Sequence, residues 1–266
     1  MSKPNGVILY QGPSLLDGSP IVAIAIGLAT KSTNSKTGAM LQTYILRSDV
    51  SPLDAVRTGR DAGICGDCRH RGDGTGKGRT CYVQVGQGPQ GVYKAFKRGR
   101  YPLWSTQASS LPLIGLDRIV RLGTYGDPAA VPVSIWSSLT SGAKGHTGYT
   151  HQWRTAPGLQ KLCMASVDSE EEAIEAWSLG WRTFRVAMTN RNTQATVEAW
   201  AMSDPDRRVE SLCPASKEAG KKLTCAQCLA CGGADGRKGS IYIPAHGGFA
   251  VMANVSKLSR IPIRTE

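Results

Sequence analysis

Seven of the eight cysteines lie in two short clusters far apart in the 266-residue chain, and this pattern limits the possible folds more than any other feature. The N-terminal thiol set consists of Cys65, Cys68 and Cys81. The C-terminal thiol set consists of Cys213, Cys225, Cys228 and Cys231. Because a C-x2-C spacing lets two thiolates reach one ion without closing a long loop, it recurs at zinc and iron–sulfur sites. The sequence therefore predicts cysteine-rich metal-binding loops.

A disulfide framework is the alternative use of these cysteines, and it requires an oxidising compartment. The first residues, MSKPNGVILYQGPS, lack the apolar stretch and cleavage site of a secretion signal. The apolar segment 21–28 is too short to cross a bilayer, so we expect a soluble intracellular chain with no membrane partner. Metal ligation is then the favoured interpretation. Cys163, in the apolar run KLCMASV, is expected to be a buried thiol outside both sets.

The formal charge of +12 favours an anionic partner, because neutralising phosphates is the main source of affinity for nucleic acid. Basic residues surround the N-terminal thiol set and follow it, interleaved with aromatic residues. This composition is typical of a surface that contacts single-stranded or flipped bases. The candidate nucleic-acid-binding residues are Arg69, Arg71, Lys77, Arg79, Lys97, Arg98 and Arg100. A solvated basic helix with buried aromatic side chains would give the same pattern.

Strand and helix patterns alternate along most of the chain. Gly, Pro, Asn and Ser separate predicted strands at 7–10, 21–28 and 41–47, which we expect to form a short antiparallel N-terminal element within residues 1–50. Beyond a predicted helix at 89–99, strands at 119–125, 148–153, 162–167 and 183–188 alternate with helices that begin near Asp127 and Asp168. Short strand–helix–strand connections indicate parallel strands.

The expected fold class is therefore α/β. A (β/α) barrel or partial barrel fits better than an open sheet, because no glycine-rich dinucleotide motif accompanies the strands. We expect one barrel-like domain over residues 1–266, with a metal-binding segment at 205–248.

Asp127 and Asp168 are the candidate catalytic residues, because each follows a predicted strand and catalytic groups gather at such strand ends in barrels. A base exchange on a nucleoside needs one carboxylate at the anomeric carbon and a second acid or base for the leaving purine. The alternative is that each aspartate only caps a helix, with Ser169 sharing that role at the second position. His151, in YTHQW, could contact a base or be a satisfied core histidine.

Several strings resemble, in the same order, the "gene product eighty-eight" family of phage proteins. They are RLGTYGDPAAVPVSIW, GYTHQW, CMASVDSEEEAIEA, CPAS, TCAQCLAC and IYIPAHG. The resemblance covers most of the chain from Cys65 to His246. It implies phage origin, action in the host cytoplasm, and a barrel-like enzyme fold with cysteine-bound metal.

Two better-known groups resemble the chain more distantly. The tRNA-guanine transglycosylases and phage DNA 7-deazaguanine transglycosylases carry a zinc site of three close cysteines and a later histidine, which is similar to Cys225, Cys228 and Cys231 followed by His246. Radical S-adenosylmethionine enzymes hold a cluster with three cysteines at C-x3-C-x2-C, whereas the N-terminal thiol set reads C-x2-C-x12-C. If Cys213 is the fourth C-terminal ligand instead of His246, that set resembles a four-thiolate cluster or a zinc ribbon.

The sequence favours the first of three functions, and the other two are alternatives. The first is a glycosyltransferase of the transglycosylase type that uses DNA and a modified-base precursor, inserts a 7-deazaguanine and contains zinc. The second is a radical-type oxidoreductase with a [4Fe–4S] cluster and S-adenosylmethionine. The third is a zinc-stabilised nucleic-acid-binding protein without catalysis.

Overall fold

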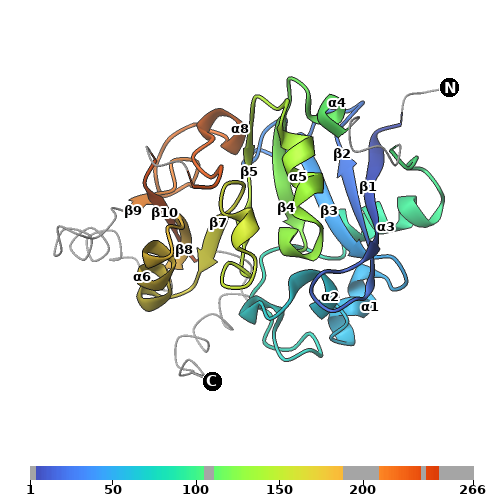
Figure 1. The fold of residues 1–266 in the computed structure, drawn as a ribbon, viewed down its shortest axis with the longest axis horizontal. Coiled ribbons are helices and arrows are strands. Elements are labelled where there is room, and N and C mark those ends of the chain that lie inside the picture. The colour runs from blue at the N-terminus through green and yellow to red at the C-terminus, as the bar shows by residue number, and fades with distance from the viewer. Residues whose placement is uncertain (1–3, 105–110, 188–209, 235–237, 246–266) are drawn as a thin grey trace.

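The first of two five-stranded sheets is mixed and contains the N-terminal strands (Figure 1). The structure is a computed structural model that describes residues 4–104, 111–187, 210–234 and 238–245. Sheet order follows chain order: β1 (Gly6–Pro13), β2 (Pro20–Ile26), β3 (Leu41–Arg47), β4 (Ile119–Tyr125) and β5 (Gly145–Thr147). β1, β2 and β3 pair antiparallel, which confirms the antiparallel N-terminal element. β3, β4 and β5 pair parallel.

The second sheet is parallel throughout. Its order is β6 (Tyr149–Thr150), β7 (Met164–Val167), β8 (Thr183–Ala187), β10 (Ser240–Pro244) and β9 (Glu210–Leu212). Only Gly148 separates β5 from β6, so the two sheets meet at that residue. A Cβ there would lie 2.7 Å from Cys163 Sγ, which explains why the junction needs glycine. Cys163 is fully buried, as its apolar surroundings predict.

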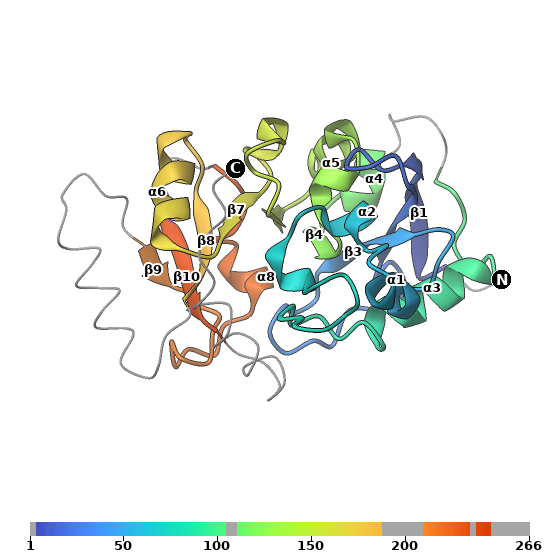
Figure 2. The ribbon, with the colours of Figure 1, turned by 90° about the horizontal axis from the view of Figure 1, so that it is seen from below.

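Short helices join and cover the strands. They are α1 (Pro52–Arg57), α2 (Ala62–Cys65), α3 (Gly88–Lys97), α4 (Leu111–Gly115), α5 (Val133–Thr140), α6 (Glu170–Ser178) and α8 (Cys225–Cys228). Figure 2 shows α6 beside β7 and β8, and the C-terminal elements β9 and β10 on the same side of the molecule. No helix in the described ranges has the length and apolar character needed to cross a membrane.

The α/β class is thus confirmed, and most predicted elements occur close to their expected positions. The helix expected from Asp127 onward differs, because residues Pro128–Ala130 form a 3-10 turn and α5 starts only at Val133. Pro132 explains the break: a proline inside a helix lacks an N–H donor and clashes with the carbonyl four residues earlier. Within the described residues, neither sheet closes into a barrel by itself.

One apolar core runs beneath the first sheet and into the second. It includes the fully buried Trp136 and the nearly fully buried Trp153 and Trp181. A second, smaller cluster contains Met164, Ile241 and Ile243 together with Cys213 and Cys231. Three members of the C-terminal thiol set, Cys213, Cys225 and Cys231, are therefore part of the packing beside β7 and β10.

Candidate functional site

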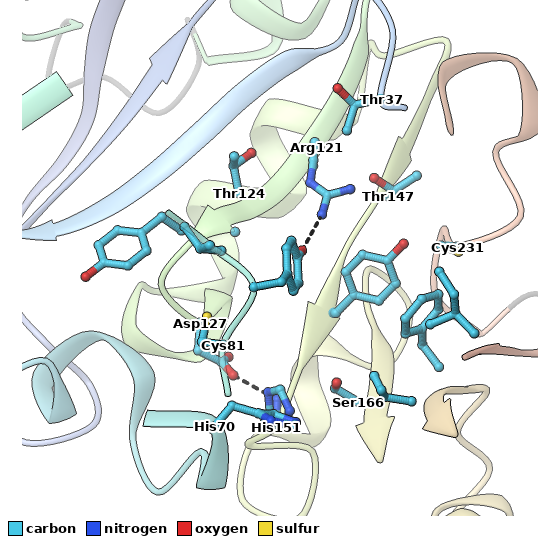
Figure 3. A pocket seen from close by; sticks show the side chains of 18 of the residues that line it. Thr37, His70, Cys81, Arg121, Thr124, Asp127, Thr147, His151, Ser166 and Cys231 are labelled. Atoms are coloured by element: carbon cyan, nitrogen blue, oxygen red, sulfur yellow. Dashed lines mark hydrogen bonds between the residues drawn. The ribbon is translucent and has the colours of Figure 1, made fainter. Parts of the chain in front are cut away.

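A cavity of about 410 Å³ lies along both sheets, and all seven clustered cysteines line it. Alternate residues of a strand point to one face, and the cavity is lined by such alternate positions: Arg121, Gly123 and Tyr125 of β4, Phe184 and Val186 of β8, and Ile243 of β10. Figure 3 shows Cys81 and Cys231 on different sides of the pocket. Thiol sets separated by more than 130 positions in the sequence thus face one space.

The N-terminal thiol set lies on the segment between β3 and β4. Cys65 ends α2, and Cys68 precedes the short 3-10 helix Arg69–Arg71. The amide of Gln152 fixes this segment, because it donates to Cys65 O at 3.2 Å and to Asp67 Oδ1 at 2.7 Å. Gly66, at φ 60°, lets the backbone pass close to Gln152, where a Cβ would lie 2.6 Å from the amide.

The thiols of this set affect one another electrostatically. Burial raises the pKa of Cys65, and the negative charges of Cys68 and Cys81 raise it further. Burial likewise raises the pKa of Cys68 to about 12. These sulfurs are therefore close together in a site where a thiolate is unfavourable without a cation. A bound metal reverses that preference, because a coordinating thiol is deprotonated outright.

The C-terminal thiol set is built on α8 and on the two segments beside it. Thr224 and Gln227 form a reciprocal capping box at the start of α8, which fixes Cys225 and Cys228 one turn apart. Burial raises the pKa of Cys231 to about 12, and the negative charges of the other three thiolates of the set also raise it. A hydrogen bond with Tyr149 acts in the opposite direction and lowers this pKa. All four sulfurs therefore interact at the cavity wall.

Arg121 is a buried cation in the same cavity that the sequence reasoning did not single out. Its Nη2 donates to Tyr82 Oη at 3.1 Å, and its guanidinium lies 5.5 Å from the ring centre of Tyr149 (Figure 3). Burial opposes its charge, but interactions with Tyr82, Tyr149, Cys225 and Cys231 outweigh this and raise the pKa of Arg121. The sequence feature that could have identified Arg121 is its charge inside the predicted strand 119–125.

Asp127 lines the cavity, but both of its carboxylate oxygens accept hydrogen bonds. Oδ1 accepts from Ala129 N at 2.9 Å and from Thr150 Oγ1 at 2.7 Å, and Oδ2 accepts from His151 N at 2.8 Å. Of the two alternatives open from the sequence, the capping role is the one observed. Burial raises the pKa of Asp127, even though these three donors lower it.

Asp168 does not cap α6, because the side chain of Ser169 does so by accepting from Glu172 N. The Asp168 side chain is only 3% exposed, and its Oδ1 lies 2.8 Å from His70 Nε2. His151 stacks edge-on against His70 with ring centres 5.4 Å apart. Within the described part of the chain, these three residues form the group whose metal-ligand atoms all lie within 4.8 Å of one another. The structure therefore places the two candidate aspartates in different surroundings.

The candidate nucleic-acid-binding residues divide into two groups. Arg71 points inward, where it donates to Gly59 O, Gly66 O and Asp61, and Arg79 donates to Cys81 O and Val83 O. The exposed members are Lys77, Lys97, Arg98 and Arg100, and Arg69 is partly buried near Asp168. The aromatic residues between them pack against the core, as in the alternative of a solvated basic helix.

His246, the other candidate fourth ligand of the C-terminal thiol set, lies outside the described residues, as do residues 205–209, 235–237 and 246–248 of the predicted metal-binding segment. Comparison of the chain with family models, with curated proteins and with solved structures finds no match. The resemblance to the phage family therefore stays a prediction, and the function has to be argued from the cavity itself.

Proposed function

We propose that this protein is an iron–sulfur oxidoreductase of the radical S-adenosylmethionine type, which transforms a small substrate in the cavity between its two thiol sets. The observation that carries the proposal is that Cys65, Cys68 and Cys81 and the four C-terminal cysteines line one cavity. Its volume of about 410 Å³ is within the range of small-molecule sites. On this proposal, the two sheets act together as a partial barrel around the substrate.

The topology supports the proposal. β3 is the first strand with a parallel neighbour, and the segment that follows its carboxyl end carries the N-terminal thiol set. In parallel α/β folds, ligands bind beyond the carboxyl ends of the strands. The cluster-binding cysteines would then occupy the position where such folds hold their reactive group.

The number of thiols in each set supports different roles for the two sets. Four cysteines satisfy all four irons of a [4Fe–4S] cluster, whereas three leave one iron open to another ligand. On this proposal the N-terminal set, with three thiols on the cavity wall, holds the reactive cluster, which would supply an electron to S-adenosylmethionine. The C-terminal set, with four thiols, would hold a closed, auxiliary cluster.

Anaerobic purification followed by iron, sulfide and zinc analysis tests this proposal. We expect brown protein with about eight irons and a similar amount of sulfide, as two [4Fe–4S] clusters require. Cys68→Ser and Cys228→Ser form a matched pair, because each removes one thiol from a different set. Addition of S-adenosylmethionine should change the electron paramagnetic resonance spectrum of reduced Cys228→Ser protein, which retains the three-thiol cluster, and leave that of Cys68→Ser unchanged. Colourless, folded protein that contains only zinc would contradict the proposal.

The two other functions remain predictions. Insertion of a 7-deazaguanine into DNA draws support from Asp127, which lies at the end of β4 on the cavity wall. Its test is mass spectrometry of nucleosides from DNA exposed to zinc-loaded protein and a modified-base precursor. A zinc-stabilised DNA-binding protein would retain DNA in a gel-shift assay and yield no modified nucleoside. The metal analysis separates both of these from the iron–sulfur enzyme.

A further inference from the structure

His70, His151 and Asp168 form a compact group on a wall of the cavity, and the proposed function does not use it. We propose that these three residues bind one divalent first-row transition-metal ion, such as Fe²⁺ or Mn²⁺, with open coordination positions toward the cavity. Two imidazoles and one carboxylate are a ligand set that such ions accept while keeping positions free for water or substrate. This site is separate from both thiol sets and does not depend on an iron–sulfur cluster being present.

The distances fit a shared ion. His70 Nε2 and Asp168 Oδ1 are 2.8 Å apart, and one atom from each of the three residues lies within 4.8 Å of the others. Bonds of about 2.1 Å place neighbouring ligands of one ion roughly 3 Å apart. Without a metal, a proton must lie between His70 and Asp168, and an ion would take the place of that proton. Only His151 then needs a small movement to complete the set.

The contacts around the two histidines orient their rings as in metal sites. His70 Nδ1 lies 2.7 Å from Thr80 Oγ1, so Nδ1–H can donate to the hydroxyl while Nε2 faces the ion. The backbone of His151 is fixed by its N–H bond to Asp127. Its Nε2 is buried and has no hydrogen-bond partner within the described residues. A buried nitrogen without a partner is costly, and a metal bond would satisfy it.

A simple ion pair between His70 and Asp168 is the competing explanation. It accounts for the 2.8 Å contact but gives no role to His151, whose ring centre lies 5.4 Å from that of His70. Both histidines line the cavity, whereas Asp168 lies behind them with its side chain almost fully buried. This arrangement gives an ion three protein ligands on one side and the cavity on the other.

Binding of Mn²⁺ to the full-length chain tests the site, because this ion prefers nitrogen and oxygen ligands to thiolates. The loss of the free-ion signal in electron paramagnetic resonance measures the bound fraction. We expect one bound Mn²⁺ per chain and a loss of affinity of at least tenfold in His151→Ala and in Asp168→Asn. Thr80→Val removes only the contact behind His70 and should weaken binding about 10- to 100-fold. Asp54→Asn, which removes an exposed carboxylate of α1, is the control and should bind Mn²⁺ like the unchanged chain.

Two results would overturn this inference. One is the absence of saturable Mn²⁺ binding to folded protein, and the other is binding that persists unchanged in both His151→Ala and Asp168→Asn. Circular dichroism and the melting temperature show whether each variant is folded, and Thr80→Val offers a milder change if the others are unstable. Iron and sulfide content of His151→Ala separates the two proposals, because the iron–sulfur clusters should form in that variant even if the divalent site is lost.

Discussion

Replacing Asp127 by asparagine should destabilise the fold, because this carboxylate joins three parts of the site. Its side chain binds Ala129 N, Thr150 Oγ1 and His151 N, and its own backbone N–H donates to Ile64 O, one residue before Cys65. Asparagine keeps the size of the side chain but replaces one acceptor oxygen by an NH₂ donor. That donor would face either a backbone N–H or the hydroxyl of Thr150.

The expected loss in the free energy of unfolding follows from these contacts. If asparagine keeps the two bonds at Oδ1, its NH₂ group faces His151 N–H. One hydrogen bond to a charged group, about 1.5–3 kcal/mol, is then lost, and an unsatisfied buried donor adds about 1–3 kcal/mol. Burial raises the pKa of Asp127, so removal of the charge returns part of this cost. We expect a net loss of about 2–4 kcal/mol in the free energy of unfolding. That corresponds to a melting temperature lower by roughly 5–15 °C.

Urea titration followed by circular dichroism measures this change, with metal content determined for each sample. Thr150→Ser is the control, because it keeps the hydroxyl that donates to Asp127 and accepts from Gln152 N, and its loss should be smaller. A melting temperature of Asp127→Asn within about 2 °C of the unchanged chain, at equal metal content, would refute the reasoning. Asp127 would then contribute little to the stability of the fold and could act as a catalytic carboxylate, as base exchange requires.

Three further predictions concern the framework. Glu210→Ala removes the buried contact with Arg185, whose Nη2 lies 2.6 Å from Glu210 Oε2, while Arg185 keeps its ion pair with Glu170. The change should cost about 1.5–3 kcal/mol in urea unfolding because hydrogen bonds between charged groups are lost. Gly148→Ala should lower the melting temperature by several degrees, since its Cβ would meet backbone and sulfur atoms at the sheet junction, with the largest loss expected near β6 in hydrogen exchange. For Asp49, burial raises the pKa, but hydrogen bonding and the charge of Arg47 outweigh it and lower the pKa. Its stabilisation is therefore present above the unfolded-state value near 3.9 and lost as pH falls through the folded value, so Asp49→Asn should lose less stability between pH 6 and pH 3 in urea titrations.

Local patterns predicted most of the framework because local physics determines it. The strand 119–125 and the helix start at Ser169 follow from apolar runs and a capping serine, and both occur in the structure. Two elements were missed although they carry local signals, namely α8 with its capping pair Thr224 and Gln227, and β10 with the apolar run 241–243. The junction at Gly148 was also missed, because the predicted strand 148–153 covers β6 but not β5, and only tertiary pairing shows that the chain passes between two sheets there.

The candidate site was predicted only in part, because its key contacts join residues that are far apart in the chain. The C-x2-C spacings identified both thiol sets, but nothing in either spacing indicates that the sets face one cavity. His70 and Asp168 are 98 positions apart, and each has an ordinary local explanation. The position of Arg121 on the cavity wall could not be predicted, because alternate residues of a strand point to opposite faces and the sequence does not show which face of β4 borders the cavity.

The inward-pointing arginines also change the meaning of the chain's positive charge. The formal net charge of +12 counts cysteines as neutral, and from the sequence alone this positive charge indicates binding to an external anion. In the structure, Arg71 secures the segment of the N-terminal thiol set, and Arg121 interacts with Cys225 and Cys231 of the other set. Thiolates that bind metal carry negative charge, which nearby guanidinium groups stabilise. Among the described residues, Arg71 and Arg121 therefore interact with groups around the cavity, whereas Arg98 and Arg100 are exposed to an external polyanion.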